Sequence, residues 1–224
     1  PKRPYRSLMN SRVILVSDNR SSLRSPDTLL WPDAACMRGI HTGEWTAHIF
    51  EYAMSFEGNM TQVRELAAAN GVGVLHPHGA LATDPPGLVV CDVDSTVTRT
   101  EAIDLLAECA GKADEVREIT TRAMAGELDF AQSLYARVRC LERLHIGALE
   151  EARKATVVTP GTAELVAAAH EVGAAVGLVS GGFTALVDPL AEQIGADFAA
   201  SNELEIVDNH LTGRVVGDII DRAA

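Results

Sequence analysis

Two aspartates that follow an apolar run are the residues best placed to do chemistry. Leu88 to Val93 is apolar except at Asp92, and Asp94 follows two residues later. Since the side chains of a strand alternate, both carboxylates are expected on one side and Val93 on the other. Two like charges this close repel each other, which a divalent cation or a functional pKa shift would relieve. The alternative is an Asp-rich loop that caps the next helix, but the buried strand expected before the pair and Ser95-Thr96 after it favour chemistry.

A second candidate is the turn Ser180-Gly181-Gly182, which follows the apolar run Ala174 to Val179. In open α/β sheets the ligand lies beyond the carboxyl ends of the strands, where both candidates are expected. A hydroxyl, unobstructed backbone N–H groups and a following helix N-terminus together suit a phosphate oxygen. Alone, this turn is an ordinary strand-to-helix connection. Beside the aspartate pair, a phosphate site is the favoured interpretation.

The elements that must position these residues alternate between strands and helices after about residue 84. We expect helices over 98–110, 115–125, 130–144, 162–172 and 184–194, strands over 88–93, 155–158 and 174–179, and a hairpin of 198–207 and 211–216. This order predicts an α/β fold, a Rossmann-like and mainly parallel sheet with helices on both faces. The three helices from 98 to 144 have no strand between them, so we expect them to form a helical insertion.

Residues 1–83 are expected to form a separate, small α+β region, whose role the sequence does not reveal. A linker rich in Pro and Gly ends this region near Thr83, and the second region is expected to span 84–224. The first region contains the apolar run Val13 to Val16, two tryptophans (Trp31 and Trp45), a helix over 60–70 that ends at Gly71, and a strand over 72–75.

The composition excludes several classes of protein. The 224 residues carry 31 Asp and Glu against 19 Lys and Arg, a net charge of −12, which argues against a nucleic-acid partner. No apolar run approaches the roughly 18 residues of a membrane span, so no membrane partner is expected. The four cysteines form no CxxC pair. This spacing argues against a zinc site and is typical of reduced thiols in the cytosol.

Several motifs together resemble the phosphoserine phosphatases of the haloacid dehalogenase superfamily. The resemblance implies a haloacid dehalogenase-like fold with a helical cap at about 98–154. It also implies hydrolysis of O-phosphoserine through an aspartyl phosphate, the last step of serine biosynthesis, in the cytoplasm. The alternatives are an inactive fragment and a phosphatase of another small phosphate ester, and a homodimer stays open. The motifs lie between Gly87 and Ala224 and are Asp92–Thr96, Ala123–Phe130, Gln132–Val138, Val179–Phe183, Ala200–Leu204 and Leu211–Gly213.

The resemblance implies a role for each residue of the two candidate sites. Asp92 would be the nucleophile, and Asp94 would be the general acid and base. Mg²⁺ would bridge the Asp92 carboxylate, the Asp94 backbone carbonyl and the phosphate, so that both aspartates are metal ligands. Ser180, Gly181 and Gly182 would bind the phosphate group.

The same resemblance places four residues around the rest of the substrate. Glu101 would bind the ammonium group, although Thr98-x-x-Glu101 also fits a helix capping box. Arg137 would bind the substrate carboxylate with its planar fork, and the alternative is a solvated arginine on an amphipathic helix. Met124 and Phe130 would be apolar walls of the cap or, alternatively, ordinary helix-packing residues.

The sequence departs from the family pattern at its end. The pattern continues to a lysine that holds the phosphate and to Gly-Asp-Gly-x-x-Asp, which completes the metal site, whereas this sequence stops at Ala224. Asp218 and Asp221 lie at an expected helix start and are predicted to be solvated or capping. We therefore expect a fragment that is inactive or impaired by itself. Its sheet should have an exposed apolar edge, which predicts poor solubility.

Overall fold

The computed structural model describes residues 11–17, 35–41, 46–52, 60–77, 79–82 and 84–221. The chain divides into two compact units, residues 1–85 and residues 86–224, each of which is described by itself. Trp31 and Trp45 lie outside the described residues.

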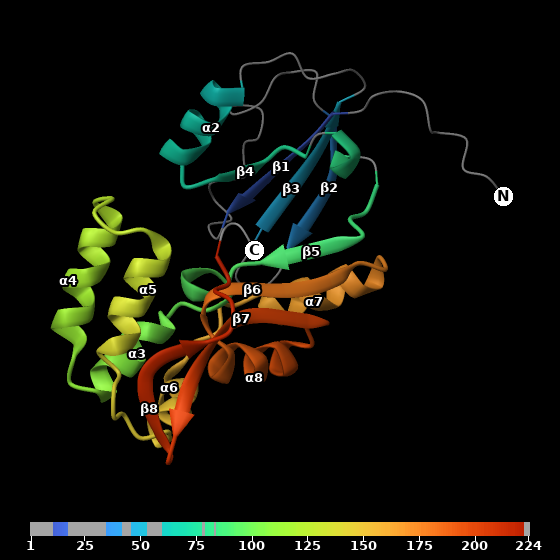
Figure 1. Ribbon diagram of the computed structural model, residues 1–224. Helices are drawn as coiled ribbons and strands as arrows, with labels where there is room; N and C mark the ends of the chain where they lie inside the picture. The colour runs from blue at the N-terminus through green and yellow to red at the C-terminus, as the bar shows by residue number, and fades with distance from the viewer. Residues whose placement is uncertain are drawn as a thin grey trace. The chain divides into compact units, whose positions relative to one another are not determined.

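The first unit contains a four-stranded antiparallel sheet in the order β2-β3-β1-β4 (Figure 1). Alternate residues of β1 are buried, and Val13 and Leu15 have no exposed surface. The predicted helix is confirmed, because α2 ends just before Gly71, whose φ of +68° suits glycine. The elements are β1 (Ser11–Ser17), β2 (Ala35–His41), β3 (Thr46–Tyr52), α2 (Met60–Ala69), β4 (Gly73–Leu75) and the short 3₁₀ helix η1 (Gly79–Ala82).

The second unit is built on a sheet in the order β5-β6-β7-β8, in which only the last pair is antiparallel. One face of β6 presents Val176 and Leu178, and α7 and α8 pack on this face (Figure 1). The predicted α/β class with a mainly parallel sheet is confirmed. The strands are β5 (Leu88–Cys91), β6 (Ala175–Phe183), β7 (Phe198–Val207) and β8 (His210–Val216), and the helices are α7 (Thr162–Glu171) and α8 (Thr184–Ile194).

The strand before the aspartates is only partly buried. In the described residues β5 pairs with β6 alone, so it lies at the edge of the sheet. Leu88 and Val90 are each 52% exposed. Val90 pairs with Gly177, which pairs with Phe198, so these residues share the face opposite to α7 and α8. The expectation of a buried strand is therefore wrong for one of its two faces.

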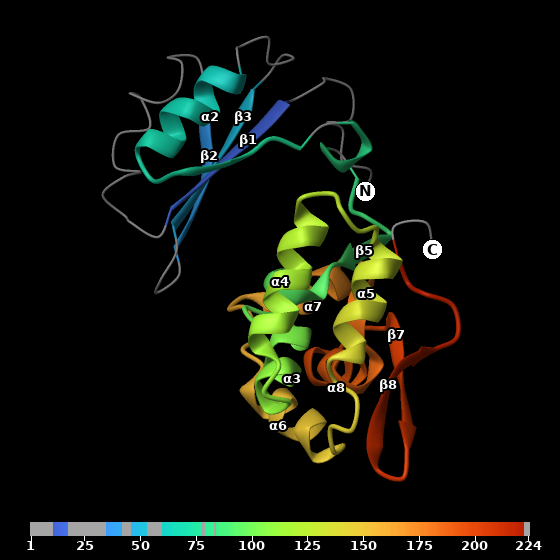
Figure 2. The same cartoon turned by 60° about the vertical axis from the view of Figure 1, so that its left-hand side comes forward.

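Four helices between β5 and α7 form the insertion, and α4 and α5 stand side by side in it (Figure 2). Leu134, Val138 and Leu141 recur at helical spacing and are at most 2% exposed, because they pack against α3 and α4. Before these helices, residues Val93–Val97 form the turn η2. The helices are α3 (Ala102–Cys109), α4 (Ala113–Met124), α5 (Phe130–Arg139) and α6 (Gly147–Ala155).

Two predicted helix boundaries and one predicted strand in this region are wrong. Helix α3 begins at Ala102 rather than Thr98, because Thr98 is extended and forms a bridge with Val158, and the Arg99 N–H donates to the Val157 carbonyl. Helix α5 ends at Arg139 rather than Leu144, because the chain turns there and Arg143, with a φ of +67°, donates its N–H to the Leu211 carbonyl. The expected strand over 155–158 is replaced by the end of α6, which the sequence did not predict, and by an isolated bridge from Val158 to Thr98.

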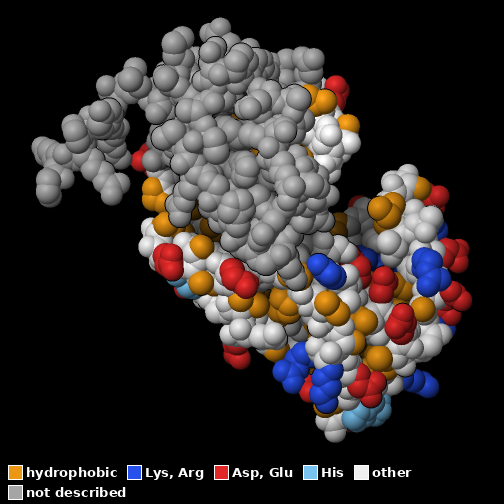
Figure 3. Space-filling model, turned by 180° about the vertical axis from the view of Figure 1, so that it is seen from behind, with side chains coloured by type: hydrophobic (Ala, Val, Ile, Leu, Met, Phe, Trp, Pro, Cys, Tyr) orange, Lys and Arg blue, Asp and Glu red, His pale blue; other side chains and the backbone are white. Residues whose placement is uncertain are grey.

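Acidic and basic side chains are interspersed on the face of the second unit seen in Figure 3, with apolar side chains between them. Within the described ranges, no helix is both long and apolar enough to cross a membrane.

Candidate active site

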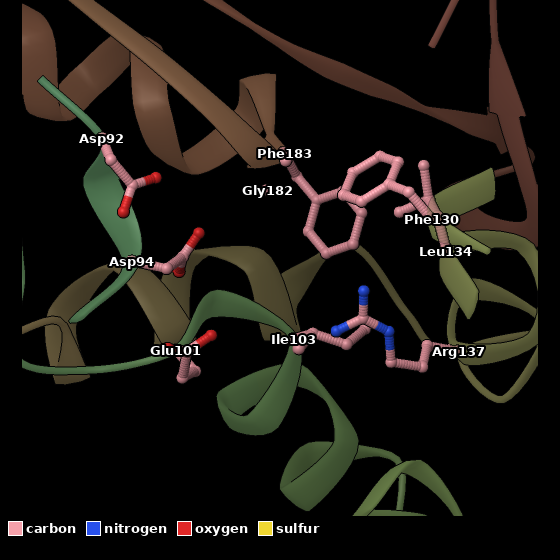
Figure 4. A pocket seen from close by; sticks show the side chains of 10 residues that line it. Asp92, Asp94, Glu101, Ile103, Phe130, Leu134, Arg137, Gly182 and Phe183 are labelled. Atoms are coloured by element: carbon pink, nitrogen blue, oxygen red, sulfur yellow. The ribbon is translucent and has the colours of Figure 1, made fainter. Parts of the chain in front are cut away.

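A cavity of about 260 Å³ lies where the end of β5, the end of β6 and the cap helices meet. Its wall combines charged and apolar side chains (Figure 4). The lining residues are Asp92, Asp94, Glu101, Ile103, Phe130, Leu134, Arg137, Gly181, Gly182 and Phe183.

The two aspartates reach this cavity although the strand that carries them ends earlier than expected. β5 ends at Cys91, but Asp92 and Asp94 both keep extended backbone angles, with ψ of 154° and 130°. Val93, the residue between the two aspartates in the sequence, is only 4% exposed and packs in the core. The expected alternation therefore holds: both carboxylates line the cavity, and the residue between them does not. The Thr96 hydroxyl donates a hydrogen bond to Asp92 Oδ2 at 3.0 Å.

Asp94 accepts hydrogen bonds on both of its carboxylate oxygens. The Ala102 N–H donates to Oδ1 at 2.7 Å, and the Ser180 hydroxyl donates to Oδ2 at 3.1 Å. Burial raises the pKa of Asp94 above its ordinary value, the negative charges of Glu101 and Asp92 raise it further, and the two hydrogen bonds oppose this shift. A carboxyl group that holds its proton to higher pH is suited to general acid catalysis.

Glu101 occupies the N-cap position of α3, but its side chain forms no capping hydrogen bond with the helix. The single proton of the Thr98 hydroxyl is instead shared between the carbonyls of Thr100, at 2.8 Å, and Val93, at 3.2 Å. The capping-box alternative is therefore wrong, because Asp94 takes the first N–H of α3. The Glu101 carboxylate faces the cavity and accepts a hydrogen bond from the Ser95 hydroxyl at 2.5 Å.

Arg137 extends from α5 into the cavity, opposite Asp94 and Glu101 (Figure 4). Its Nε donates to the Ser133 carbonyl one turn earlier at 3.3 Å. Burial lowers the pKa of Arg137, and the carboxylates of Glu101, Asp104 and Asp94 oppose this change. The solvated alternative is not what the structure shows, since this side chain lines the cavity. The sequence analysis did not identify Asp104 as an acidic neighbour of Arg137.

The glycines after Ser180 allow the backbone to form one wall of the cavity. A Cβ at Gly181 would lie 2.8 Å from Phe130 Cζ, and a Cβ at Gly182 would lie 2.8 Å from Asp94 Oδ2. Both distances are shorter than carbon side chains tolerate, so close approach requires glycine here. The expected turn is wrong, because Ser180, Gly181 and Gly182 belong to the irregular end of β6. There the Gly182 N–H donates to Ser180 Oγ at 2.8 Å.

Two of the expected substrate-binding residues do not line the cavity. Ser180 is 2% exposed and lies behind the wall, where it binds Asp94. Met124, at the end of α4, is 85% exposed. The cavity instead includes Ile103, Leu134 and Phe183, which the sequence did not single out as site residues. Helical spacing in α3 and α5 marked apolar faces but did not indicate which members would reach the cavity.

Three carboxylates and one guanidinium line the cavity, so its charge is negative. A phosphate group could enter only if a cation offset this charge. The carboxylate and carbonyl oxygens of Asp92 and Asp94 are donors that suit a hard divalent ion such as Mg²⁺, which takes one or two carboxylates and completes its shell with water and substrate phosphate. Among the residues that the structure describes, no group of three or more His, Cys, Asp or Glu could hold a metal by itself.

Comparison with known proteins identifies relatives of this chain. The model of the haloacid dehalogenase-like hydrolase family matches residues 89–224. A phosphoserine phosphatase of Streptomyces coelicolor is 50% identical over 157 residues, which are 70% of this chain and 38% of that protein. The crystal structure of a probable phosphoserine phosphatase from Vibrio cholerae is similar, with a TM-score of 0.73 and 32% identity over 93% of this chain and 64% of that one.

A substrate-bound phosphoserine phosphatase complex is 39% identical, with a TM-score of 0.57 over 61% of this chain and 65% of that one. The chain thus spans less than two thirds of the length of each of these relatives.

Proposed function

The chain belongs to the haloacid dehalogenase-like hydrolase family, and we propose that it hydrolyses O-phosphoserine to serine and phosphate. One observation carries this proposal: a single cavity holds an aspartate pair at one end, with Glu101 and Arg137 lining it as well. O-phosphoserine carries a phosphate, an ammonium group and a carboxylate. Glu101 and Arg137 complement the ammonium group and the carboxylate in charge, and the aspartate pair would meet the phosphate with a divalent cation that offsets their like charges. The names of the relatives above support the same substrate.

In the proposed reaction the two aspartates do different work. A carboxylate oxygen of Asp92 bonds to phosphorus as the bond from phosphorus to the seryl oxygen breaks, and Asp94 gives its proton to that oxygen. Water then attacks the aspartyl phosphate, Asp94 takes a proton from this water, and phosphate leaves. The raised pKa of Asp94 supports its role as the acid.

We propose Mg²⁺ as the metal, because phosphatases of this family generally use a divalent metal and the donors here are oxygen atoms. The Asp92 carboxylate and the Asp94 backbone carbonyl would hold the ion. When bound, it would supply the positive charge that the phosphate oxygens need during transfer. Both oxygens of the Asp94 side chain already accept hydrogen bonds, which supports the carbonyl as its ligand atom.

The rest of the cavity would select the amino acid. Glu101, held by Ser95, would accept hydrogen bonds from the ammonium group, and Arg137 would donate to the carboxylate. Phe130 lies against Gly181, where it would help exclude water from the reacting group. Met124 stays a prediction as an apolar wall, which would require movement of the cap.

We place this reaction at the last step of serine biosynthesis in the cytoplasm and assign it to residues 84–224, with the helical insertion as its cap. Cys91, Cys109 and Cys140 are free thiols, which supports a reducing compartment. Residues 1–83 have no proposed part in the chemistry.

The test is to measure serine and phosphate released from O-phosphoserine, with and without Mg²⁺. We expect equal amounts of both products with Mg²⁺. Asp92→Asn should reduce release to the background rate. Asp218→Asn, which changes an exposed carboxylate outside the cavity, should have no effect. The absence of both product release and saturable substrate binding would overturn the proposal.

A further inference from the structure

Asn202, on β7, is a buried polar residue whose side chain is fully engaged behind the cavity wall. It is 2% exposed. Its Nδ2 donates to the Gly181 carbonyl at 3.0 Å and approaches the Gly182 carbonyl at 3.4 Å. Its Oδ1 accepts the Ile220 N–H at 2.9 Å. Because the Ile220 donor requires an oxygen, the amide orientation is fixed and the NH₂ group faces the two glycines.

The contacts of Asn202 occur where the sheet is irregular. Strands β6 and β7 pair regularly up to Val179, and the register then shifts before Phe183 pairs with Asn202. In that gap the Asn202 side chain provides a donor to the Gly181 and Gly182 carbonyls. Buried carbonyl groups without donors are unfavourable, so a buried amide at this position stabilises the bulged conformation.

One peptide group connects Asn202 to the aspartate pair. The Gly181 carbonyl and the Gly182 N–H belong to the same planar trans peptide, so they point in opposite directions. Asn202 binds the carbonyl side, and on the other side the Gly182 N–H donates to Ser180 Oγ. That hydroxyl in turn donates to Asp94 Oδ2. Four groups thus form one continuous series of hydrogen bonds that ends on Asp94.

We infer that Asn202 is a positioning residue that fixes the Gly181–Gly182 peptide and, through Ser180, the side chain of Asp94. It does not touch the substrate. Hydrogen bonds in such a series polarise one another, so loss of the first donor affects the last acceptor. The inference rests on the proposed function only for its kinetic consequence, since the hydrogen bonds themselves can be observed without turnover.

Two variants separate positioning from general stability. Asn202→Asp keeps the shape of the side chain and an oxygen for the Ile220 N–H, but it presents an oxygen to the glycine carbonyls. Asn202→Ala removes both sets of bonds. Ser201→Ala is the matched control, because the Ser201 hydroxyl contacts Thr184 and not Gly181 or Gly182.

The first measurement is hydrogen exchange at the Gly182 amide, followed by NMR on the complete chain. We expect Asn202→Asp to speed exchange by roughly five- to tenfold, the equivalent of about one hydrogen bond. Ser201→Ala should leave it unchanged. Unchanged Gly182 exchange in Asn202→Asp would overturn the inference, whether or not the chain turns over phosphoserine.

The second measurement is the kinetics of O-phosphoserine hydrolysis. Misplacement of a catalytic group by about 1 Å costs on the order of 10²-fold, so we expect Asn202→Asp to lower kcat by roughly 10- to 100-fold with little change in KM. A structural role alone would instead lower the melting temperature while the folded fraction kept its kcat, and that result would overturn the inference. Loss of turnover in the wild-type chain would overturn the proposed function and leave the exchange result to decide the role of Asn202.

Discussion

Replacement of Arg137 by alanine tests the proposed specificity most directly. Arg137 is the only cationic residue among the ten that line the cavity in the described structure. A hydrogen bond between charged partners contributes about 1.5–3 kcal/mol, which corresponds to roughly 10- to 150-fold in kcat/KM. We expect Arg137→Ala to reduce the hydrolysis of O-phosphoserine by a factor in this range.

The informative assay compares two substrates that differ in one group. O-phosphoethanolamine has the phosphate and ammonium groups of O-phosphoserine but lacks the carboxylate. If Arg137 binds that carboxylate, Arg137→Ala should change kcat/KM for O-phosphoethanolamine by less than about threefold. The ratio of the two losses is the coupling between the side chain and the carboxylate. Arg139→Ala is the control, because Arg139 is exposed on the same helix and lines a different cavity.

Equal losses for both substrates would refute this role of Arg137. Such a result would mean that the guanidinium acts on the phosphate or on the charge of the cavity as a whole. The second explanation has a physical basis, because Arg137 lies near Glu101, Asp104 and Asp94. Burial and the charge of Glu101 raise the pKa of Asp104, and Arg137 opposes this rise. Equal losses would therefore favour a phosphatase with a broader range of small phosphate esters.

Two further predictions concern stability. A methyl group at Gly177 would overlap the Phe198 ring, so Gly177→Ala should lower the free energy of unfolding in urea by about 1–3 kcal/mol. Adding Phe198→Ala to this variant should restore part of the loss. If no stability is recovered, the overlap is not the cause. Hydrogen bonds from the Val176 N–H and the His170 ring lower the pKa of Asp197 in the folded chain. Its contribution to the stability of the fold is therefore complete above about pH 4, the pKa in the unfolded chain, and is lost as the pH falls through the lower pKa of the folded chain. Asp197→Asn should therefore be less stable than wild type at pH 6 and approach it below pH 3, and a difference that does not depend on pH would contradict this assignment.

Short sequence patterns predicted those elements of the second unit that end at residues with positive φ. Helix α8 has the predicted bounds, and Gly195, with a φ of +78°, ends it. The hairpin of β7 and β8 turns at Asp208 and Asn209, both with positive φ, as such residues allow in tight turns. These features depend on residues next to each other in the sequence, so they could be recognised without knowledge of the tertiary structure.

The features that the sequence did not predict depend on residues far apart. The spacing of Thr98 and Glu101 fits a capping box, but the Ala102 N–H is bound by Asp94, eight residues earlier. No local pattern shows that a carboxylate expected at the end of a strand will reach the start of the next helix. The contact of Asn202 with the Gly181 carbonyl is equally invisible, because it joins residues 21 apart across a bulge. The candidate site residues were predicted from sequence motifs, whereas the groups that hydrogen-bond to them could be identified only from the fold.

The structure also distinguishes two aspartates that look equivalent in the sequence. Asp94 is the more constrained, since a backbone N–H and a hydroxyl occupy its two oxygens. Asp92 is exposed and receives one hydrogen bond, from Thr96, among the described residues. A nucleophile needs an oxygen that can approach phosphorus, whereas a proton donor needs a fixed position and a raised pKa. The environments therefore support Asp92 as the nucleophile and Asp94 as the acid on physical grounds that are independent of any relative.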